Sequence, residues 1–214
     1  MSDVILHDYW RSSASYRVRI ALSLKGIDYR TSTVDLLDNE HHTPRYKALN
    51  PQSLVPTLII DGLVLTQSLA IIQYLDDTRE SPRLIPEEPI EKHRVLTLAH
   101  IIAMDIHPVC NLHVAEHVVK LTGGGSRLKK KWMKRFITRG LTNIEEQLKD
   151  CKAGQFCHGD SPTIADCCLI PQVYNALRWE VDLEHFETIR KIALHCGALP
   201  EFASVHPDMI RDVQ

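Results

Sequence analysis

The stretch VILHDYWRSSASYRVRIALSLKG, residues 4–26, predicts how the chain begins to fold. Residues 4–9 form a short apolar run rich in β-formers, which is typical of a strand. Apolar residues then recur at helical spacing over residues 15–25, and Gly26 is a favourable residue to end a helix. The stretch therefore predicts a strand followed directly by a helix.

The next segments complete a small mixed domain. Residues 29–34 read as a second strand, which would lie parallel to the first. Residues 58–60 and 63–65 flank Asp61-Gly62, the strongest short signal for a hairpin, and a helical pattern follows over residues 67–78. We expect an α+β domain over residues 1–80.

After this domain the composition changes. Residues 82–89 include three prolines and two glutamates. This composition predicts an extended linker over residues 81–88. Beyond it the pattern is helical, with one long segment over residues 90–119, bent near His107-Pro108, and another helix over residues 127–149. Thr163-Ile164-Ala165-Asp166 matches a capping box that opens a helix running to about Arg178. We expect an all-helical domain over residues 89–214.

The whole chain has the composition of a soluble globular protein. Its 214 residues are 44% hydrophobic and 24% charged, and the formal net charge is −2. This charge provides no field that would draw nucleic acid or an anionic membrane, and no apolar run approaches the ~18 residues of a membrane span. The start of the chain lacks a secretory signal. We therefore expect a cytoplasmic protein whose six cysteines are mostly buried thiols.

Serines gather where the first strand meets the first helix, at Ser12, Ser13 and Ser15. A helix N-terminus presents free N–H groups and a partial positive charge, which favour an anion. A free thiol with a pKa of ~8.5 is mostly protonated at neutral pH, and lowering that pKa by about two units requires ~2.7 kcal/mol. A hydroxyl at a helix N-terminus could supply this stabilisation of the thiolate. Taken alone, the serines are also explained as N-capping residues.

Two more features follow along the chain. Val55-Pro56 enters a strand, and a cis bond there would present the Val55 N–H and C=O to an extended peptide. Gln67-Ser68 opens the helix after the hairpin and can bind a carboxylate. Each signal is weak by itself. Their order, a thiolate site, a backbone clamp and a carboxylate site, matches the groups of glutathione.

The string RSSASYRVRIAL, residues 11–22, followed by Lys25-Gly26-Ile27, resembles zeta-class glutathione transferases, the maleylacetoacetate isomerases. Similar matches occur at residues 48–51, 55–58, 67–72, 163–166 and 181–183, so the resemblance covers almost the whole chain. The serine-containing string is specific to this class, whereas the Val-Pro and Gln-Ser elements are common to glutathione transferases. The resemblance implies a thioredoxin-like N-terminal domain, an all-α C-terminal domain and a homodimer.

The same resemblance implies roles for individual residues. Ser12 would stabilise the thiolate, with Ser13 and Ser15 beside it, and Arg11 and Arg178 would bind substrate carboxylates, Arg178 with a catalytic part. Ala14 stands where the family usually has cysteine, so any contribution of that thiol is absent. The resemblance also implies further contacts with glutathione, at Arg17, His41, Val55, Pro56, Gln67, Ser68, His107, Asn111 and His113.

The implied activity is the glutathione-dependent cis–trans isomerisation of maleylacetoacetate to fumarylacetoacetate in tyrosine and phenylalanine breakdown. Glutathione would act as a cofactor. Maleylpyruvate isomerisation, or conjugation or dehalogenation of small acids, are alternatives with the same thiol chemistry. A non-catalytic regulatory scaffold of the same fold is a further alternative, which the retained serines and Gln67-Ser68 argue against.

Two other possibilities carry less weight. His113 and His117 share a helix face, but a third ligand at a telling spacing is missing, so we expect no metal. We expect no nucleic-acid or membrane partner either, because the basic residues of the second long helix spread around it without interleaved aromatic residues. They are Arg127, Lys129, Lys130, Lys131, Lys134 and Arg135.

Overall fold

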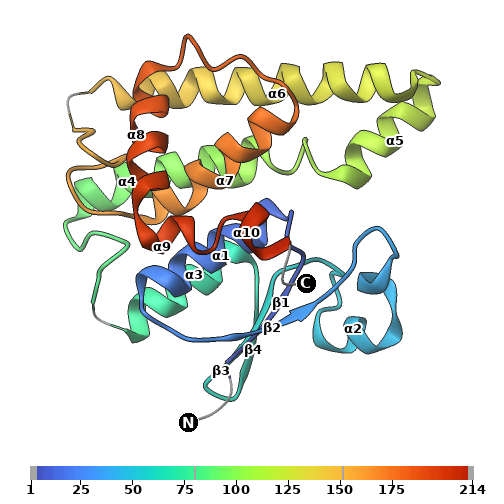
Figure 1. Ribbon diagram of the computed structural model, residues 1–214, viewed down its shortest axis with the longest axis horizontal. Helices are drawn as coiled ribbons and strands as arrows, with labels where there is room; N and C mark the ends of the chain where they lie inside the picture. Colours follow the sequence, from blue (N-terminus) through green and yellow to red (C-terminus); the bar gives the residue numbers. More distant parts are fainter. Residues whose placement is uncertain (1–3, 80, 151, 212–214) are drawn as a thin grey trace. The chain divides into compact units, whose positions relative to one another are not determined.

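The computed structural model describes residues 4–79, 81–150 and 152–211 (Figure 1). The chain forms two compact units. The first contains the chain up to Leu84 and again from Gly197, and the second is Ile85–Cys196. The segment from Gly197 belongs to the first unit, where α9 lies against α1.

The first unit contains a four-stranded sheet of order β2-β1-β3-β4. β1 is parallel to β2 and antiparallel to β3, and β3 forms a hairpin with β4. At the hairpin turn, Asp61 and Gly62 have φ values of 55° and 76°, the left-handed pair that a two-residue turn prefers. The predicted strands and the parallel pair are therefore confirmed. The strands are β1 (Ile5–Asp8), β2 (Arg30–Thr33), β3 (Thr57–Ile60) and β4 (Leu63–Thr66).

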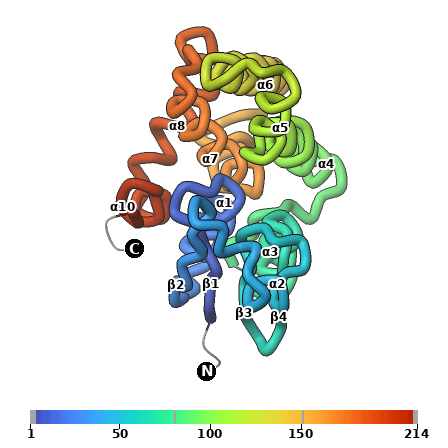
Figure 2. Tube along the Cα trace, turned by 90° about the vertical axis from the view of Figure 1, so that its right-hand side faces the viewer, coloured from blue at the N-terminus to red at the C-terminus, as the bar shows by residue number. Residues whose placement is uncertain are grey.

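Helices α1 and α3 of this unit lie side by side (Figure 2). They bury an apolar core that includes Leu6, Leu58 and Ile71. Gly26, just beyond α1, has a φ of 63°, which confirms it as the residue after the helix end. The helices are α1 (Ser13–Leu24), η1 (Glu40–His42), α2 (Pro44–Leu49), α3 (Ser68–Thr78), α9 (Pro200–Ala203) and α10 (Pro207–Arg211).

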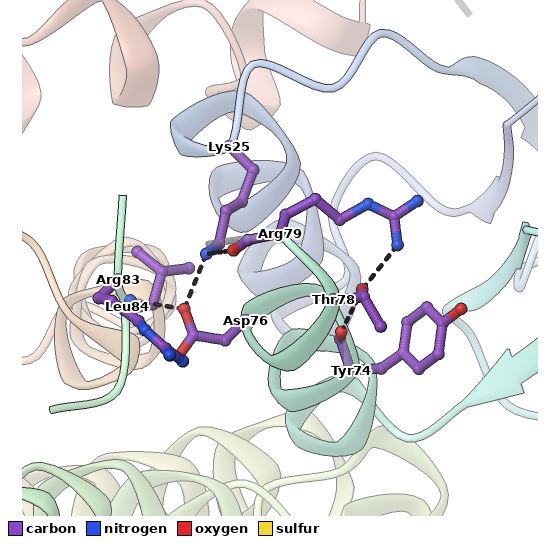
Figure 3. A network of polar contacts seen from close by, with 7 residues as sticks. All are labelled: Lys25, Tyr74, Asp76, Thr78, Arg79, Arg83 and Leu84. Carbon is purple, nitrogen blue, oxygen red and sulfur yellow. Dashed lines mark hydrogen bonds and ion pairs between the residues drawn. The ribbon is translucent and has the colours of Figure 1, made fainter. Parts of the chain in front are cut away.

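The end of α1 is tied to α3 and to the segment after it by a buried ion pair (Figure 3). The Lys25 ammonium lies 2.8 Å from an Asp76 oxygen and donates to the Arg79 carbonyl at 2.7 Å. The same Asp76 oxygen accepts the Leu84 N–H at 2.7 Å. Because both charged side chains are buried, the pair fixes where the chain leaves the first unit.

The second unit is helical over its described residues, as the sequence predicts. One expectation is wrong: the helix predicted over residues 90–119 is broken rather than bent. A π-helical turn precedes a break at His107, and Pro108, which lacks an N–H, cannot continue the ladder. Among the described residues no helix combines the length and apolarity needed to cross a bilayer. The elements are α4 (Pro89–His100), η2 (Ile101–Ile106), α5 (Leu112–Thr122), α6 (Gly125–Leu148), α7 (Ile164–Arg178) and α8 (Glu187–Ala198).

The capping box predicted for α7 is present. One oxygen of Asp166 accepts the Thr163 N–H at 2.8 Å, and the other accepts the Cys157 N–H at 2.8 Å. Burial raises the pKa of the Asp166 carboxyl, against the lowering effect of these bonds. The box thus joins the start of α7 to the loop before it. Cys157 and the other described cysteines are buried free thiols; Cys151 lies outside the described residues.

Candidate active site

The first candidate residues lie at the N-terminus of α1. Ser12 is the N-cap residue, and its Oγ accepts the Ser15 N–H at 3.2 Å. This confirms the capping role that the sequence allowed. The cap uses an oxygen lone pair and leaves the hydroxyl hydrogen able to donate to an anion. Ser12 and Ser13 are half-buried, so the helix N-terminus stays accessible.

Ser15 adds an unpaired polar atom at the same place. The residue is fully buried, and its Oγ has no hydrogen-bond partner in the part of the chain that the structure describes. A buried hydroxyl without a partner is costly, and in a folded protein it calls for an explanation such as a ligand. The serine cluster therefore offers the half-buried Ser12 hydroxyl and free helix N–H groups to an anion, while the Ser15 hydroxyl is enclosed.

The carboxylate site expected at the start of α3 is joined to this cluster by Arg17. Ser68, the first residue of α3, is buried, and its Oγ accepts from the Arg17 guanidinium at 3.2 Å. Gln67 caps the helix with a φ of 67°, a left-handed value that is unusual for a non-glycine residue. Its amide donates to the Gln52 side chain at 2.8 Å. Such strained backbone is frequent in ligand-binding sites.

The next candidate is the backbone clamp expected at Val55-Pro56. The peptide bond is cis. The preceding Leu54 carbonyl is held by the Tyr46 hydroxyl and the Asn50 amide, both at 2.7 Å. The side chain of Val55 is buried, while its backbone N–H and C=O have no hydrogen-bond partner among residues 4–79, 81–150 and 152–211. A fixed main chain with free polar groups can pair with an extended peptide.

His41 lies in the short helix η1. Its ring is 4.0 Å from that of His42, and its Nδ1 is buried without a partner among the described residues. Burial, and then the neighbouring His42, lower the pKa of the His41 imidazole. At neutral pH the ring is therefore neutral, and it would meet a carboxylate by donating a hydrogen bond.

The remaining candidates belong to the second unit. His107 follows η2, and Asn111 precedes α5, with its Oδ1 3.0 Å from Nδ1 of His113. Arg178 is the last residue of α7 and is exposed. His113 and His117 are not part of any metal-binding group among the described residues.

The basic residues of α6 correct one expectation. Rather than spreading around the helix, most of them lie along one open face of it. Lys129 is not among them and pairs with Glu116 at 3.2 Å. The residues of this face are Arg127, Lys130, Lys131, Lys134, Arg135, Thr138 and Arg139.

One structural residue escaped the sequence reasoning. Arg19 is fully buried in α1, and its guanidinium makes two bonds to the Asp8 carboxylate, at 2.9 and 2.7 Å. It also donates to the carbonyls of Trp10, at 2.9 Å, and Val205, at 3.3 Å. The sequence does contain a signal for this buried pair: Arg19 stands between Val18 and Ile20 in an apolar stretch, and Asp8 ends the preceding strand. Arg19 holds the loop that leads into the serine cluster.

A parallel β-α-β unit followed by a β-hairpin and a closing helix defines a thioredoxin-like domain. The family model "Glutathione S-transferase, N-terminal domain" matches residues 11–78. The chain is 52% identical to the maleylacetoacetate isomerase of Rhizobium meliloti over 97% of each chain.

Solved structures of the same class of protein also resemble this chain. One is the holo structure of maleyl pyruvate isomerase, a bacterial zeta-class glutathione transferase, with a TM-score of 0.94 at 40% identity, covering 96% of this chain and 97% of that one. Another is the maleylacetoacetate isomerase of Anaeromyxobacter dehalogenans with dicarboxyethyl glutathione and citrate in its active site. Its TM-score is 0.86 at 38% identity, covering 97% and 92%. The chain belongs to the zeta class of glutathione transferases, the maleylacetoacetate isomerase family.

Proposed function

We propose that this protein is a glutathione-dependent isomerase that converts maleylacetoacetate to fumarylacetoacetate in the cytoplasm, in tyrosine and phenylalanine breakdown. The observation that carries the proposal is the serine cluster at the start of α1. It places two hydroxyls at a helix N-terminus, and the buried one, Oγ of Ser15, has no hydrogen-bond partner among the described residues. Family membership supplies the substrate class.

The residues of the first unit fit glutathione. The backbone of Val55, which has no hydrogen-bond partner within the described part of the chain, matches an extended peptide. Gln67 and Ser68 offer donors for the γ-glutamyl carboxylate, and the neutral His41 offers one for the glycyl carboxylate. His107, Asn111 and His113 are further proposed contacts. When bound, glutathione supplies a thiolate that adds to the cis double bond and leaves after rotation about the resulting single bond.

The protein's own groups favour this chemistry in two ways. The Ser12 hydroxyl and the free N–H groups of α1 donate toward the sulfur, which favours the thiolate over the thiol. Arg11 and Arg178 bind the carboxylates of the substrate, because a planar guanidinium pairs with a carboxylate through two hydrogen bonds. No step requires a change of oxidation state.

Maleylpyruvate is the second candidate substrate, because a maleyl pyruvate isomerase superposes on this chain with a TM-score of 0.94. A spectroscopic assay of the purified protein with each substrate, with and without glutathione, tests both. We expect isomerisation of maleylacetoacetate only when glutathione is present. Turnover without glutathione, or a conjugate accumulating in place of the isomer, would contradict the proposal.

Ser12→Ala is expected to raise the pKa of bound glutathione by one or more units, because the thiolate loses its hydroxyl donor. Titration of thiolate absorbance near 240 nm in the complex measures this. Glu88→Ala is the control, since Glu88 caps α4 by accepting the Glu91 N–H at 2.8 Å and its loss should cost only a helix cap, about 1 kcal/mol. Identical titration curves for Ser12→Ala and the parent would remove Ser12 from this role.

We also propose that the protein is a two-fold symmetric homodimer, as the resemblance to its class implies. Light scattering at micromolar concentration should then give twice the mass of the 24.4 kDa chain. A mass equal to one chain would be evidence against it.

A further inference from the structure

Helix α6 (Figure 1) carries a straight row of cations along its N-terminal half. Every fourth residue from position 127 to position 139 is a lysine or an arginine, and all four side chains are exposed. At 1.5 Å per residue the row is about 18 Å long, with about 6 Å between neighbouring positions along the axis. We call it the basic stripe; its members are Arg127, Lys131, Arg135 and Arg139.

The basic stripe lies opposite the side through which α6 packs. Met133, Ile137 and Leu141 are buried in the second unit, where α6 contacts η2 and α7. Each of them follows a member of the stripe by two residues, which is about 200° around a helix with 3.6 residues per turn. The cations therefore contribute nothing to the packing of α6 and point to the open side of the helix.

No acidic side chain compensates these four charges. Among residues 4–79, 81–150 and 152–211, none of the four lies within ion-pair distance of a carboxylate. Two cations beside the stripe are paired, Lys129 with Glu116 and Lys130 with Glu180. Within α6 itself the first acidic residue is Glu145, beyond the end of the stripe. The stripe thus stays charged and available to a ligand.

The arrangement is unfavourable for the helix by itself. Like charges four residues apart on a helix repel each other, and the stripe repeats that spacing three times. Cations near the N-terminus of a helix also oppose its dipole, and Arg127 is the third residue of α6. A sequence feature that breaks such local rules without a gain in packing is typical of a functional site. An anionic ligand removes both conflicts.

The distribution of charge along the chain selects a short ligand. Residues 127–139 contain seven of the 25 lysines and arginines and no acidic residue, so the other 201 residues carry 18 cationic against 27 acidic side chains. At physiological ionic strength a charge acts over about 8 Å. A long polyanion such as duplex nucleic acid would extend past the stripe over a protein of net negative charge. A segment of about 18 Å would not.

Other groups of α6 argue against nucleic-acid bases and lipid. The Trp132 ring lies against that of Phe136, with centroids 4.5 Å apart, and its indole N–H donates to the Val109 carbonyl at 2.8 Å. These rings are therefore already engaged and are not free for bases to stack on. All of α6 is described, and none of its large apolar side chains is exposed, whereas a helix that lies in a membrane surface needs an open apolar face.

We propose that the basic stripe is the docking surface for an acidic helix of a partner protein, with a carboxylate at every fourth residue. A helix with that repeat spaces its carboxylates by the same 6 Å, so that each one meets one cation. The three arginines can each bond a carboxylate through two parallel N–H groups. No member of the stripe belongs to the candidate active site, so this proposal is independent of the isomerase function.

The test uses fluorescence anisotropy with the full-length protein and a labelled alanine-rich peptide of about 17 residues, long enough to form a helix. The peptide carries four glutamates at every fourth position. An exposed charge pair changes affinity about twofold, so this peptide should bind tenfold or more tighter at low salt than one with glutamine at the same positions. The difference should fall below about threefold at 0.5 M salt. A third peptide, with its four glutamates consecutive, should bind severalfold more weakly than the first.

Substitutions locate the binding on the stripe. Lys131→Gln combined with Arg135→Gln removes two pairs and should weaken the glutamate peptide about fourfold. The matched control is Lys92→Gln combined with Arg190→Gln, which removes two exposed cations of α4 and α8 and should leave the affinity unchanged. Lys131→Glu combined with Arg135→Glu should instead prefer a peptide whose two central glutamates are replaced by lysine. Circular dichroism should show that each variant is folded.

Four results would overturn the proposal. One is equal affinity for the glutamate and glutamine peptides at low salt, and another is a loss on Lys131→Gln/Arg135→Gln no larger than in the control. Tighter binding of a 20-bp DNA duplex than of the glutamate peptide at about 0.15 M salt would make the stripe a nucleic-acid surface. A mass in light scattering that changes with the double substitution would assign it to contacts between copies of this chain. Isomerase kinetics of the parent protein test the proposed function separately.

Discussion

Asp8→Ala is expected to lower the free energy of unfolding by about 3–5 kcal/mol. Asp8 and Arg19 are both completely buried, and the carboxylate accepts two bonds from the guanidinium. Removing the carboxylate leaves a positive charge in the interior without its partner. Urea denaturation followed by circular dichroism measures the change, and at such a cost the variant should unfold at a much lower urea concentration.

Two controls define the origin of this loss. Glu116→Ala removes one partner of the exposed pair with Lys129 and should cost at most about 1 kcal/mol. Asp8→Ala combined with Arg19→Met removes both charges and should recover part of the stability, because the unpaired ion is gone. If Asp8→Ala alone is as stable as Glu116→Ala, the buried pair does not contribute to stability as argued.

Arg178→Ala is expected to lower kcat/KM on the order of thirtyfold or more while leaving glutathione affinity nearly unchanged. Arg178 is exposed at the end of α7, so a substrate carboxylate can reach its guanidinium. Losing one partner of a partly desolvated charged pair costs about 2–5 kcal/mol. Steady-state isomerase kinetics and calorimetry with glutathione measure the two quantities on one preparation.

The simpler explanation of Arg178 predicts a different result. A surface arginine that only complements the dipole of α7 contributes about 0.3–1 kcal/mol to stability and nothing to kinetics. Arg178→Lys should recover part of the activity, and Arg190→Ala should leave it unchanged. If kcat/KM barely changes, or if glutathione binding is lost along with activity, Arg178 does not bind the substrate.

The regular elements of the first unit were predictable because their signals are local. The short apolar run that ends at Tyr9, the helical spacing up to Gly26 and the Asp61-Gly62 turn each specify their own backbone. The same holds for the capping box at Thr163. The candidate thiol site could be proposed on similar grounds, because a serine-rich strand-to-helix junction is visible in the sequence.

What remained hidden depends on partners distant in the sequence. Nothing near Arg19 indicates that its guanidinium binds a carbonyl 186 residues later. The break after η2 was read as a bend, because periodicity continues across it. The short helix α2 is only six residues long, too short for a periodic pattern to reveal. The guanidinium carbon of Arg211 lies 5.8 Å from the centroid of the Trp10 ring, and no motif indicates this contact either.

The return of the last residues to the first unit has a consequence for biosynthesis. On the ribosome, the sheet and α1 emerge early, but the backbone that Arg19 binds at Val205 is among the last parts of the chain to be made. At ~5–20 residues per second, the roughly 140 residues between the last strand and Val205 take about 7–28 s to synthesise. Throughout this time the nascent first unit carries an incompletely bonded buried arginine and an uncovered face of α1. A fragment ending at Leu84 would reproduce that nascent state permanently, so the unit that carries the serine cluster cannot be cut from the gene as one continuous piece.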